Sequence, residues 1–324
     1  KIMLNKKIFI TGATGSFGTE FVKHILKTYK PKKVTIFSRD ELKQYNFKNY
    51  SFIKNTKSKV RFLLGDVRDK DRLDFAISDQ PDYVIHAAAL KQVDTAEYNP
   101  SEFIKTNIIG AENLISACLK YKIPKVLALS TDKASSPVNL YGATKLVSDK
   151  LFISANNYSK ITKLSIVRYG NVNFSRGSIL PKLIEQSKEN LFTLTDSKMT
   201  RFSTNLKDST IFVSKILKKM KGGEIFIPKL KSYRLIDLVK AINVKAKIKY
   251  IGFRPGEKLH EEMISSTESK NTIEYKDSFV IYPHLTKKKI NKKIVNGYRS
   301  DVNKFLKISE IVEIIKKEKK IEDG

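Results

Sequence analysis

The sequence predicts an α/β fold built on a doubly wound parallel sheet, followed by a smaller C-terminal α/β domain. Three observations predict it. Six short apolar runs alternate with helix-periodic segments over roughly residues 6–170. A glycine-rich turn follows the first run, and a Tyr–Lys pair spaced for one helix face follows the fifth. Alternation of this kind is typical of parallel strands joined by right-handed helical crossovers.

The first strand, Lys7–Ile10, runs directly into T-G-A-T-G-S-F-G and then into a helical pattern. Strand, glycine turn and helix in this order form the Rossmann-type dinucleotide fingerprint. Gly12 permits the tight turn, Gly15 lets the backbone approach a pyrophosphate, and Gly18 allows close packing of helix on strand. The phosphates would meet the helix N-terminus. The predicted cofactor contacts in this turn are Thr11, Gly12, Thr14, Gly15, Ser16, Phe17 and Gly18.

The second strand, Val34–Phe37, ends in Ser38 and Arg39, both predicted cofactor contacts. An acidic residue at the first of these positions would accept the ribose 2′-hydroxyl of NAD, whereas an arginine suits a 2′-phosphate by its charge and fork geometry. The sequence therefore favours NADP over NAD. Asp40 keeps NAD open, because it could itself bind the ribose. Lys43 is a second possible phosphate contact.

The third and fourth strands, Arg61–Leu64 and Tyr83–His86, are each followed by residues predicted to complete the cofactor site. Small side chains after the fourth strand leave room for a flat ligand, although packing alone also explains them. The predicted contacts here are Asp66, Val67, Ala87, Ala89, Lys91 and Asn107. Lys91 could also face a substrate phosphate.

The fifth strand, Lys125–Ser130, leads into S-T-D-K-A-S-S-P-V-N-L-Y-G-A-T-K, and the sixth is Lys163–Arg168. Tyr141 and Lys145 are four residues apart, so they share one helix face. The ammonium would lower the phenol pKa from its usual ~10 towards working pH and make Tyr141 a general base. This pair alone is a weak signal.

Beyond residue 170 the alternation becomes irregular. We therefore expect an NADP-binding domain at 1–170 and a mainly substrate-binding domain at 171–324, with some segments returning to the first. Three polar clusters in the second half, 175–178, 199–202 and 254–257, place arginines on loops where they suit a diphosphate and its ribose. The predicted substrate contacts are Lys91, Thr131, Asn171, Ser178, Thr195, Met199, Arg201, Arg254 and Glu257.

Composition narrows the classes of partner. The 324 residues carry 62 basic and 33 acidic side chains, a net charge of +29. This charge suits an anionic partner, but the lysines are scattered, and no recognition helix or zinc-finger spacing accompanies them. We expect no nucleic acid partner. No apolar run approaches the ~20 residues of a membrane span, and no signal-peptide pattern precedes the first strand, so we expect no membrane and a cytoplasmic protein. A single cysteine, Cys118, excludes an internal disulfide and a cysteine-rich metal site.

Several longer motifs together resemble one family. T-G-x-x-G-x-x-G with Y-x-x-x-K is similar to the extended short-chain dehydrogenases/reductases. A closer resemblance, to the inverting UDP-N-acetylglucosamine 4,6-dehydratases that begin pseudaminic acid synthesis, rests on T-D-K-A-x-x-P-x-N-x-Y-G-A-T-K, R-Y-G-N-V, S-R-G-S, M-T-R-F and I-G-x-R-P-G-E-K-L-H-E-E-M. It covers nearly the whole chain. Asn173, Phe174 and Ser203 depart from the expected pattern, and they bear on the identity of the sugar.

The resemblance implies a hydro-lyase that acts on a UDP-sugar with NADP. Tyr141 and Lys145 would take the C-4 hydroxyl proton as hydride passes to NADP, and Thr131 would orient that hydroxyl. Asp132 would be the C-6 acid and Lys133 the C-5 base, where relatives that retain the C-5 configuration carry Asp-Glu. The implied product is UDP-2-acetamido-2,6-dideoxy-β-L-arabino-hex-4-ulose, and the implied assembly is a homo-oligomer, either dimer or hexamer.

Two questions stay open in the sequence. A UDP-sugar epimerase or 4-ketoreductase would use the same Tyr–Lys pair, and the +29 charge keeps an NADP sensor or nucleic-acid binder as a non-enzymatic alternative. The roles of Asp132 and Lys133 also need one protonated carboxyl and one neutral amine. Burial pushes both pKa values in that direction, whereas their mutual attraction opposes it.

Overall fold

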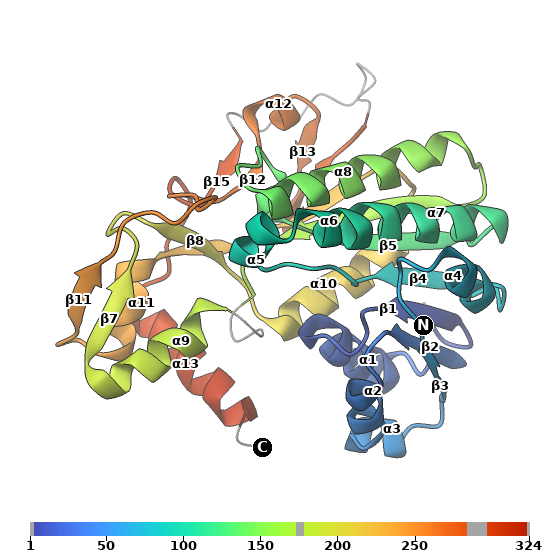
Figure 1. The fold of residues 1–324 in the computed structure, drawn as a ribbon, viewed down its shortest axis with the longest axis horizontal. Coiled ribbons are helices and arrows are strands. Elements are labelled where there is room, and N and C mark those ends of the chain that lie inside the picture. Colours follow the sequence, from blue (N-terminus) through green and yellow to red (C-terminus); the bar gives the residue numbers. More distant parts are fainter. Residues whose placement is uncertain (1–2, 173–177, 284–296, 323–324) are drawn as a thin grey trace.

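A nine-stranded, mostly parallel sheet is the centre of the protein (Figure 1). The computed structural model describes residues 3–172, 178–283 and 297–322. Asn173, Phe174 and the first three residues of the cluster at 175–178 lie outside the described residues. The strand order is β13-β14-β9-β6-β5-β4-β1-β2-β3, and its last six strands follow the order 6-5-4-1-2-3 of a dinucleotide-binding sheet.

The six predicted strands all form, within two residues of their predicted ends. They are β1 (Lys7–Thr11), β2 (Lys33–Ser38), β3 (Lys59–Leu64), β4 (Tyr83–His86), β5 (Lys125–Thr131) and β6 (Lys163–Tyr169). All their pairings are parallel. The predicted fold class is confirmed. Because parallel strands present their carboxyl ends at one edge, the glycine turn and the Thr131–Lys145 segment emerge at the same edge.

Three strands from the second half of the chain extend this sheet. β9 (Ile225–Pro228) pairs in parallel with β6, and β14 (Ser278–Ile281) and β13 (Thr272–Glu274) continue in antiparallel fashion. The sequence analysis assigned no strands to these segments, which are short and depend on partners far away in the chain.

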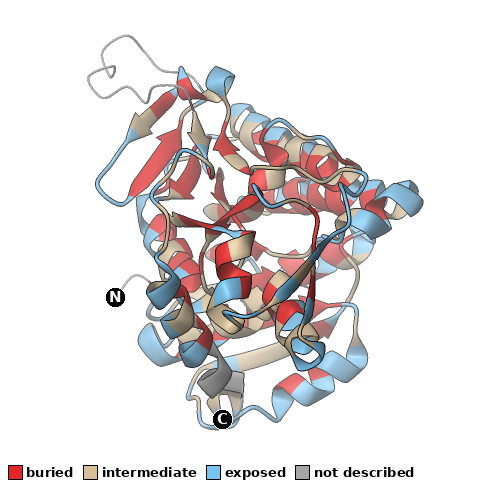
Figure 2. Ribbon diagram, turned by 90° about the vertical axis from the view of Figure 1, so that its left-hand side faces the viewer, coloured by how far each residue is buried: buried red, intermediate tan, exposed pale blue. Residues whose placement is uncertain are grey.

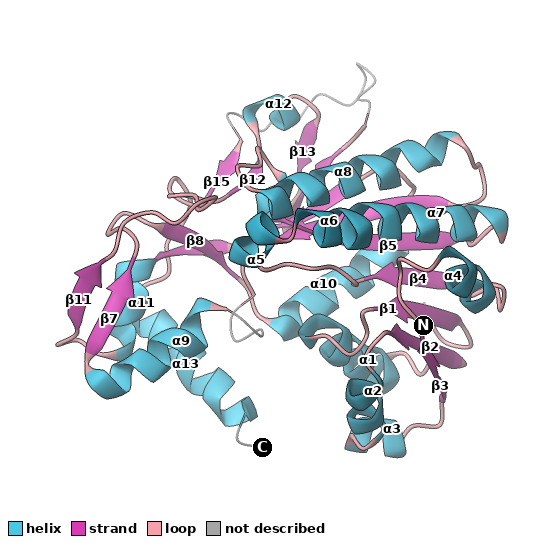
Figure 3. Ribbon diagram, viewed as in Figure 1, coloured by secondary structure: helices cyan, strands magenta, loops and turns pink. Residues whose placement is uncertain are grey.

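Helices cover both faces of the sheet (Figure 3). On one face α1 (Ser16–Thr28) packs against α10 (Leu206–Lys219), and Phe21 and Val213 belong to the apolar core there. On the other face α7 (Gly110–Lys120) packs between α4 (Lys70–Ile77) and α8 (Leu140–Ser154). The remaining short helices of this half are α2 (Glu41–Lys48), α3 (Ser51–Lys54), α5 (Val93–Tyr98) and α6 (Pro100–Phe103).

The remaining chain builds a smaller lobe beside the carboxyl edge of the sheet (Figure 1). Its elements are β7 (Leu191–Leu194) paired with β11 (Lys247–Tyr250), β8 (Thr200–Ser203) paired with β10 (Lys231–Arg234), and the helices α9 (Ile179–Gln186), α11 (Leu235–Ile242) and α13 (Ile308–Glu322). They enclose an apolar core of their own. Two further short strands, β12 (Glu262–Ile264) and β15 (Tyr298–Arg299), pair next to α12 (Ser266–Ser269).

Buried residues follow the strands and the inner faces of the helices (Figure 2). The lone thiol, Cys118, lies fully buried in α7. Among the described residues no helix combines the length and apolarity that a membrane span requires. Within the same residues, no His, Cys, Asp and Glu side chains form a group that could hold a metal ion.

Candidate active site

A cleft of about 720 Å³ lies between the carboxyl edge of the large sheet and the smaller lobe. The glycine turn lines one part of it, the Thr131–Lys145 segment another, and Arg201 and the 254–257 loop line the part that belongs to the smaller lobe. The cleft thus brings together the three regions in which the sequence concentrates its polar motifs.

The glycine turn has the geometry that a dinucleotide requires. Helix α1 has Gly15 as its N-cap with no side-chain cap hydrogen bond, and the first turn of the helix lines the cleft. Gly12 adopts φ = 66°, and a Cβ atom there would lie 2.6 Å from the backbone nitrogen of Ala88. A Cβ atom on Gly18 would lie 2.5 Å from Ala13. Only glycine fits these two positions, and the turn suits a nucleotide pyrophosphate.

The end of β2 presents an arginine. The Arg39 side chain is 56% exposed, and its guanidinium lies 3.7 Å from Asp66 Oδ2. Asp40 is engaged elsewhere, since it caps α2 by accepting a hydrogen bond from the Lys43 backbone N–H (2.9 Å) and pairs with the Lys43 ammonium (2.8 Å). Asp40 is thus held by its own helix, and Arg39 is the more exposed of the two charges at this strand end.

Asn107 connects two elements of the site through hydrogen bonds. It lies in a π-helical turn, Ile104–Ile109, and its amide exchanges hydrogen bonds with the backbone of Leu90 (2.9 Å each) and donates to Thr144 Oγ1 (3.0 Å). The side chain is buried. Asn107 thereby ties the loop after β4 to the helix that carries Tyr141.

Tyr141 and Lys145 lie buried on α8, as their spacing predicts. The Lys145 ammonium donates to the carbonyl of Leu129 (2.8 Å), and burial lowers the Lys145 pKa while Asp149 opposes that shift. Burial raises the pKa of Tyr141 to about 12, although the Lys133 cation and a hydrogen bond with Thr131 act in the opposite direction. The sequence predicted a phenol with a lowered pKa. The structure differs because the phenol is removed from water, an effect that helix spacing cannot reveal.

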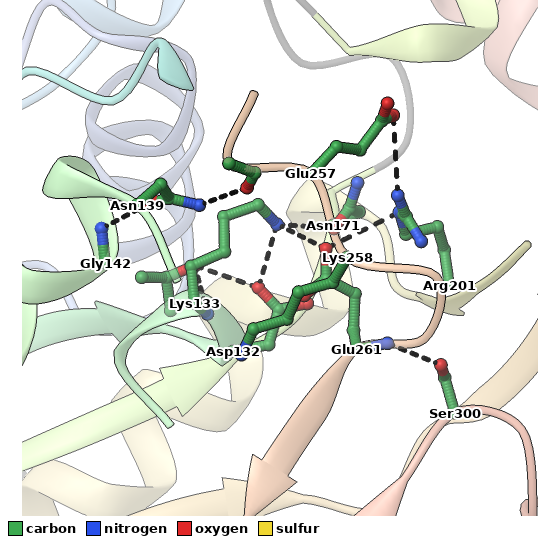
Figure 4. A network of polar contacts seen from close by, with 12 residues as sticks. Asp132, Lys133, Asn139, Gly142, Asn171, Arg201, Glu257, Lys258, Glu261 and Ser300 are labelled. Atoms are coloured by element: carbon green, nitrogen blue, oxygen red, sulfur yellow. Dashed lines mark hydrogen bonds and ion pairs between the residues drawn. The ribbon is translucent and has the colours of Figure 1, made fainter. Parts of the chain in front are cut away.

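Lys133 lies between two carboxylates (Figure 4). Its ammonium donates to Asp132 Oδ1 at 3.1 Å and to Glu261 Oε1 at 2.9 Å, and also reaches Asn171 Oδ1 at 3.4 Å. Thr131 Oγ1 donates to the same Asp132 oxygen at 3.0 Å. Asp132 and Glu261 are almost completely buried, whereas 19% of the Lys133 side chain is exposed.

The electrostatics of this cluster resolve the question that the sequence left open. Burial lowers the pKa of Lys133, but the carboxylates of Asp132 and Glu261 outweigh it, so the Lys133 pKa is raised. Burial and the Glu261 carboxylate raise the pKa of Asp132 against the opposing effect of Lys133. Attraction to the carboxylates therefore sets the direction of the Lys133 pKa shift, whereas burial, with repulsion from Glu261, sets that of Asp132.

Glu261 is a site residue that the sequence analysis missed. It stands in the quoted motif I-G-x-R-P-G-E-K-L-H-E-E-M, but nothing in that motif distinguishes it from Glu262. Its backbone is fixed on both sides, because its N–H donates to Ser300 Oγ and its carbonyl accepts from the Ser300 N–H, both at 2.9 Å. The partner that reveals its role, Lys133, lies 128 positions earlier in the chain.

The smaller lobe contributes a second charged group. Arg201 Nε lies 3.5 Å from Glu261 Oε1, and another guanidinium nitrogen lies 3.8 Å from Glu257. Thr195 Oγ1 donates to Glu257 at 3.0 Å. Met199 has no exposed surface and belongs to the core of the lobe, and its sulfur lies 3.1 Å from Arg201. The structure thus places Met199 behind Arg201 and outside the cleft.

Most of the predicted site residues line the cleft. They are Gly12, Gly15, Ser16, Phe17, Gly18, Ala87, Ala89, Lys91, Thr131, Asp132, Lys133, Tyr141, Lys145, Asn171, Ser178, Thr195, Arg201, Arg254 and Glu257. The others lie around it or beyond it, at Thr11, Thr14, Ser38, Arg39, Lys43, Asp66, Val67, Asn107 and Met199. Val67 packs in the apolar core under Gly110, where a Cβ atom would lie 2.6 Å from it.

Comparison with known proteins agrees with these motifs. A family profile described as "Polysaccharide biosynthesis protein" matches residues 8–283. A Campylobacter jejuni protein named UDP-N-acetylglucosamine 4,6-dehydratase (inverting) is 52% identical over 86% of this chain and 84% of its own length. A Rickettsia bellii protein named UDP-glucose 4-epimerase is 42% identical over 82% of this chain and 80% of its own.

A solved structure shows the same fold. The X-ray structure of Pen from Bacillus thuringiensis matches with a TM-score of 0.89 and 36% identity, over 98% of this chain and 99% of that one. These matches confirm the resemblance to the inverting UDP-N-acetylglucosamine 4,6-dehydratases that the sequence motifs indicate. The chain belongs to the polysaccharide biosynthesis protein family, among short-chain dehydrogenases/reductases that include the inverting UDP-N-acetylglucosamine 4,6-dehydratases.

Proposed function

We propose that this protein is an inverting UDP-N-acetylglucosamine 4,6-dehydratase, a hydro-lyase that forms UDP-2-acetamido-2,6-dideoxy-β-L-arabino-hex-4-ulose. The observation that carries the proposal is the Asp132–Lys133 pair. It lies in one cleft with Tyr141 and Lys145, and its hydrogen bonds run through Thr131 to the phenol. The 52% identical relative has the same named activity. On this basis the protein acts in the pseudaminic acid pathway.

Tyr141, Lys145 and Thr131 act first, at C-4 of the sugar. Tyr141 takes the proton of the C-4 hydroxyl as a phenolate, the form that the Lys133 cation and the Thr131 hydrogen bond favour against the effect of burial. The Thr131 hydroxyl orients the C-4 hydroxyl. Lys145 is held by the Leu129 carbonyl, which fixes its ammonium beside the site. NADP, when bound, would supply the hydride chemistry of the reaction.

Asp132 and Lys133 act next, at C-6 and C-5. A C-4 ketone acidifies the C-5 hydrogen. Lys133 takes this proton after its ammonium has given up one of its own, while Asp132 protonates the departing C-6 hydroxyl. Lys133 is the partly exposed member of the cluster, and Asp132 lines the same cleft, so both groups border the space that the sugar would enter. The raised pKa of Asp132 supports its role as an acid.

Arg39 supports NADP as the cofactor. Its exposed guanidinium stands at the end of β2, where the 2′-phosphate of NADP would lie, and Asp40 is occupied in capping α2. Lys43 would be a secondary contact. We propose that residues 1–170 mainly bind this cofactor.

The UDP-sugar would bind across residues 171–324. Arg201, Arg254 and Lys91 line the cleft and suit a diphosphate, while Thr195, Asn171 and Ser178 offer hydrogen bonds to ribose and sugar hydroxyls. Glu257 holds Arg201 and Thr195 in place. A homo-oligomer, dimer or hexamer, is proposed from the family.

A C-4 epimerase is the rival activity, because the Rickettsia bellii relative is named UDP-glucose 4-epimerase. Epimerisation at C-4 needs the Tyr–Lys pair but no group at C-5 or C-6. The buried ion cluster of Asp132, Lys133 and Glu261 would have no role in it, and burying such a cluster is costly. The cluster therefore favours the dehydratase.

Turnover in deuterated water tests the proposal. The protein with NADP should convert UDP-N-acetylglucosamine to a 4-keto-6-deoxy sugar that carries deuterium at C-5, and Lys133→Ala should abolish this product. Formation of UDP-N-acetylgalactosamine without C-5 deuterium, unaffected in Lys133→Ala, would establish the epimerase instead. Mass spectrometry and proton NMR distinguish the two products.

A further inference from the structure

Glu261 gives Lys133 a second counter-ion from the opposite side of the cleft. Its Oε1 is the nearer carboxylate oxygen to the Lys133 ammonium, at 2.9 Å against 3.1 Å for Asp132. Its other oxygen, Oε2, is buried and has no hydrogen-bond partner among the residues that the structure describes. A buried carboxylate that leaves one oxygen unpaired is costly unless its charge is used.

The charged side chains around Lys133 come from separate parts of the chain. Asp132 belongs to the segment after β5, Glu261 to the approach to β12, and Arg201 to β8. Lys258 interacts with the same cluster more weakly, and its ammonium donates to the Ser135 carbonyl. When all are ionised, Asp132 and Glu261 carry two negative charges, and Lys133 and Arg201 carry two positive charges. Lys258 adds a further positive charge.

We propose that Glu261 is a positioning residue for the loss of water: as the counter-ion of Lys133 it frees Asp132 to hold the proton that leaves with the C-6 hydroxyl. This rests on the proposed dehydratase. Without Glu261 the ammonium would have Asp132 as its one carboxylate partner among the described residues, and Asp132 would be fixed as an anion. With Glu261 present, a second negative charge on Asp132 is opposed by repulsion as well as by burial.

The proton movements balance. One ammonium proton first passes from Lys133 Nζ to Glu261 Oε1. The neutral Nζ then takes the C-5 proton as the C-5–H bond breaks. The C-5–H electron pair forms the C-5=C-6 double bond, the C-6–O bond breaks, and the hydroxyl leaves as water with the Asp132 proton. Lys133 is still an ammonium, Glu261 is a carboxylic acid, and Asp132 is a carboxylate.

The starting protonation states of Lys133, Glu261 and Asp132 are restored through the same hydrogen bonds. When C-5 is reprotonated by Lys133, Glu261 returns its proton to Nζ. Asp132 regains its own from Tyr141, which holds the proton of the C-4 hydroxyl, through the Thr131 hydroxyl between them. The proton lost with water is thus the one taken from C-4, and no proton from bulk water is needed.

The first test needs no substrate. Aspartate labelled with carbon-13 at its carboxyl, assigned through Asp132→Asn, reports the titration of Asp132 by NMR in the holoenzyme. Glu261→Gln keeps an oxygen that can accept from Lys133 but removes the charge, so the Asp132 midpoint should fall by at least one pH unit, a tenfold loss of proton affinity. Glu261→Asp should preserve the raised midpoint. An unchanged or higher midpoint in Glu261→Gln overturns the proposal.

Glu262→Gln is the matched control. Glu262 is the next residue, but its carboxylate accepts from the hydroxyls of Ser135 and Ser136 on the other side of the strand. Removal of its charge should leave the midpoint of Asp132 within about 0.3 pH units, a small fraction of the shift that a contacting charge produces. An equal shift in Glu262→Gln would mean a general field effect and would refute a specific role for Glu261.

The second test separates the steps of turnover. In single turnovers with UDP-N-acetylglucosamine, Glu261→Gln should form reduced cofactor at the wild-type rate and then eliminate water at least tenfold more slowly. The slow step should recover at lower pH, because the acid form of Asp132 returns. Equal slowing of both steps, with no pH recovery, would show a structural role only. A wild-type protein that eliminates no water would refute the dehydratase, and the Asp132 titration would still decide the role of Glu261.

Discussion

The backbone of Gly142 lies against the carbonyl oxygen of Lys133, so closely that a Cβ atom on Gly142 would stand 2.2 Å from that oxygen. The helix that carries Tyr141 therefore packs directly on the segment that carries Asp132 and Lys133. This contact fixes the distance between Tyr141, proposed to act at C-4, and the groups proposed to act at C-5 and C-6.

Gly142→Ala should consequently impair both stability and turnover. Alanine normally stabilises a helix by about 0.5–1 kcal/mol relative to glycine, so a lower melting temperature would show that the contact with Lys133, and not helix propensity, decides the outcome. We expect at least a tenfold loss of turnover, because a displacement of Tyr141 disturbs the alignment of the reacting groups. Thermal unfolding and steady-state assays measure this, and a more stable, fully active variant would contradict it.

Lys133→Met should destabilise the protein in a pH-dependent way. It leaves the buried carboxylates of Asp132 and Glu261 without their shared cation, at a cost of about 3 kcal/mol, the lower end for breaking a buried ion pair since Lys133 is partly exposed. The folded-state pKa of Asp132, already raised, rises further without the cation. A raised carboxyl pKa favours folding at low pH and opposes it as the pH increases.

The difference in unfolding free energy between wild type and Lys133→Met should therefore narrow as the pH falls towards 4, the ordinary range of an Asp carboxyl. Urea unfolding at several pH values measures it. A constant difference across the range would mean that the two carboxylates do not share the Lys133 charge.

Arg39→Ala should change the choice of cofactor. Removal of a charged hydrogen bond to a 2′-phosphate costs about 1.5–3 kcal/mol, so NADP affinity should fall at least tenfold. NAD has no phosphate there and serves as the internal control. Titration of intrinsic fluorescence or calorimetry compares the two, and equal losses for NAD and NADP would refute the role of Arg39.

His86 should make the protein sensitive to acid. Its Nδ1 lies 2.8 Å from Thr11 Oγ1, and burial, with Lys145 nearby, lowers its pKa to about 3. A folded-state pKa below the unfolded value of about 6.5 stabilises the protein fully above pH 6.5 and loses that contribution as the pH falls towards 3. His86→Asn should flatten this part of the stability curve, and a parallel curve for the variant would disprove the assignment.

The sequence predicts the six parallel strands β1–β6 well because five of them are largely buried on both faces of the sheet and read as nearly continuous apolar runs, while the edge strand β3 keeps such a run in Phe62–Leu64 although it is only partly buried. It does not predict β9, β13 and β14, whose few residues become strands only by pairing with β6 and with one another. The local pattern of residues predicts β1–β6, whereas β9, β13 and β14 depend on long-range contacts that this pattern does not contain.

The site divides in the same way. Tyr141 and Lys145 are four residues apart, and their shared helix face follows from spacing alone. The raised pKa of Tyr141 does not, because it depends on what covers the phenol. Glu261 has no local signal at all, since its partner is brought to it by the fold of the whole chain.

The ion pair between Lys133 and Glu261 joins two halves of a chain that could otherwise diverge independently. The segment after β5 would support hydride transfer in any relative that keeps Tyr141 and Lys145, whereas the approach to β12 carries Glu261, the counter-charge proposed for elimination. A change of reaction within this fold can therefore begin far from the Tyr–Lys pair. Grafting the corresponding segment of an epimerase that lacks the Glu261 carboxylate onto residues 1–170 of this chain should yield an enzyme that oxidises its sugar and eliminates water at least tenfold more slowly than this protein.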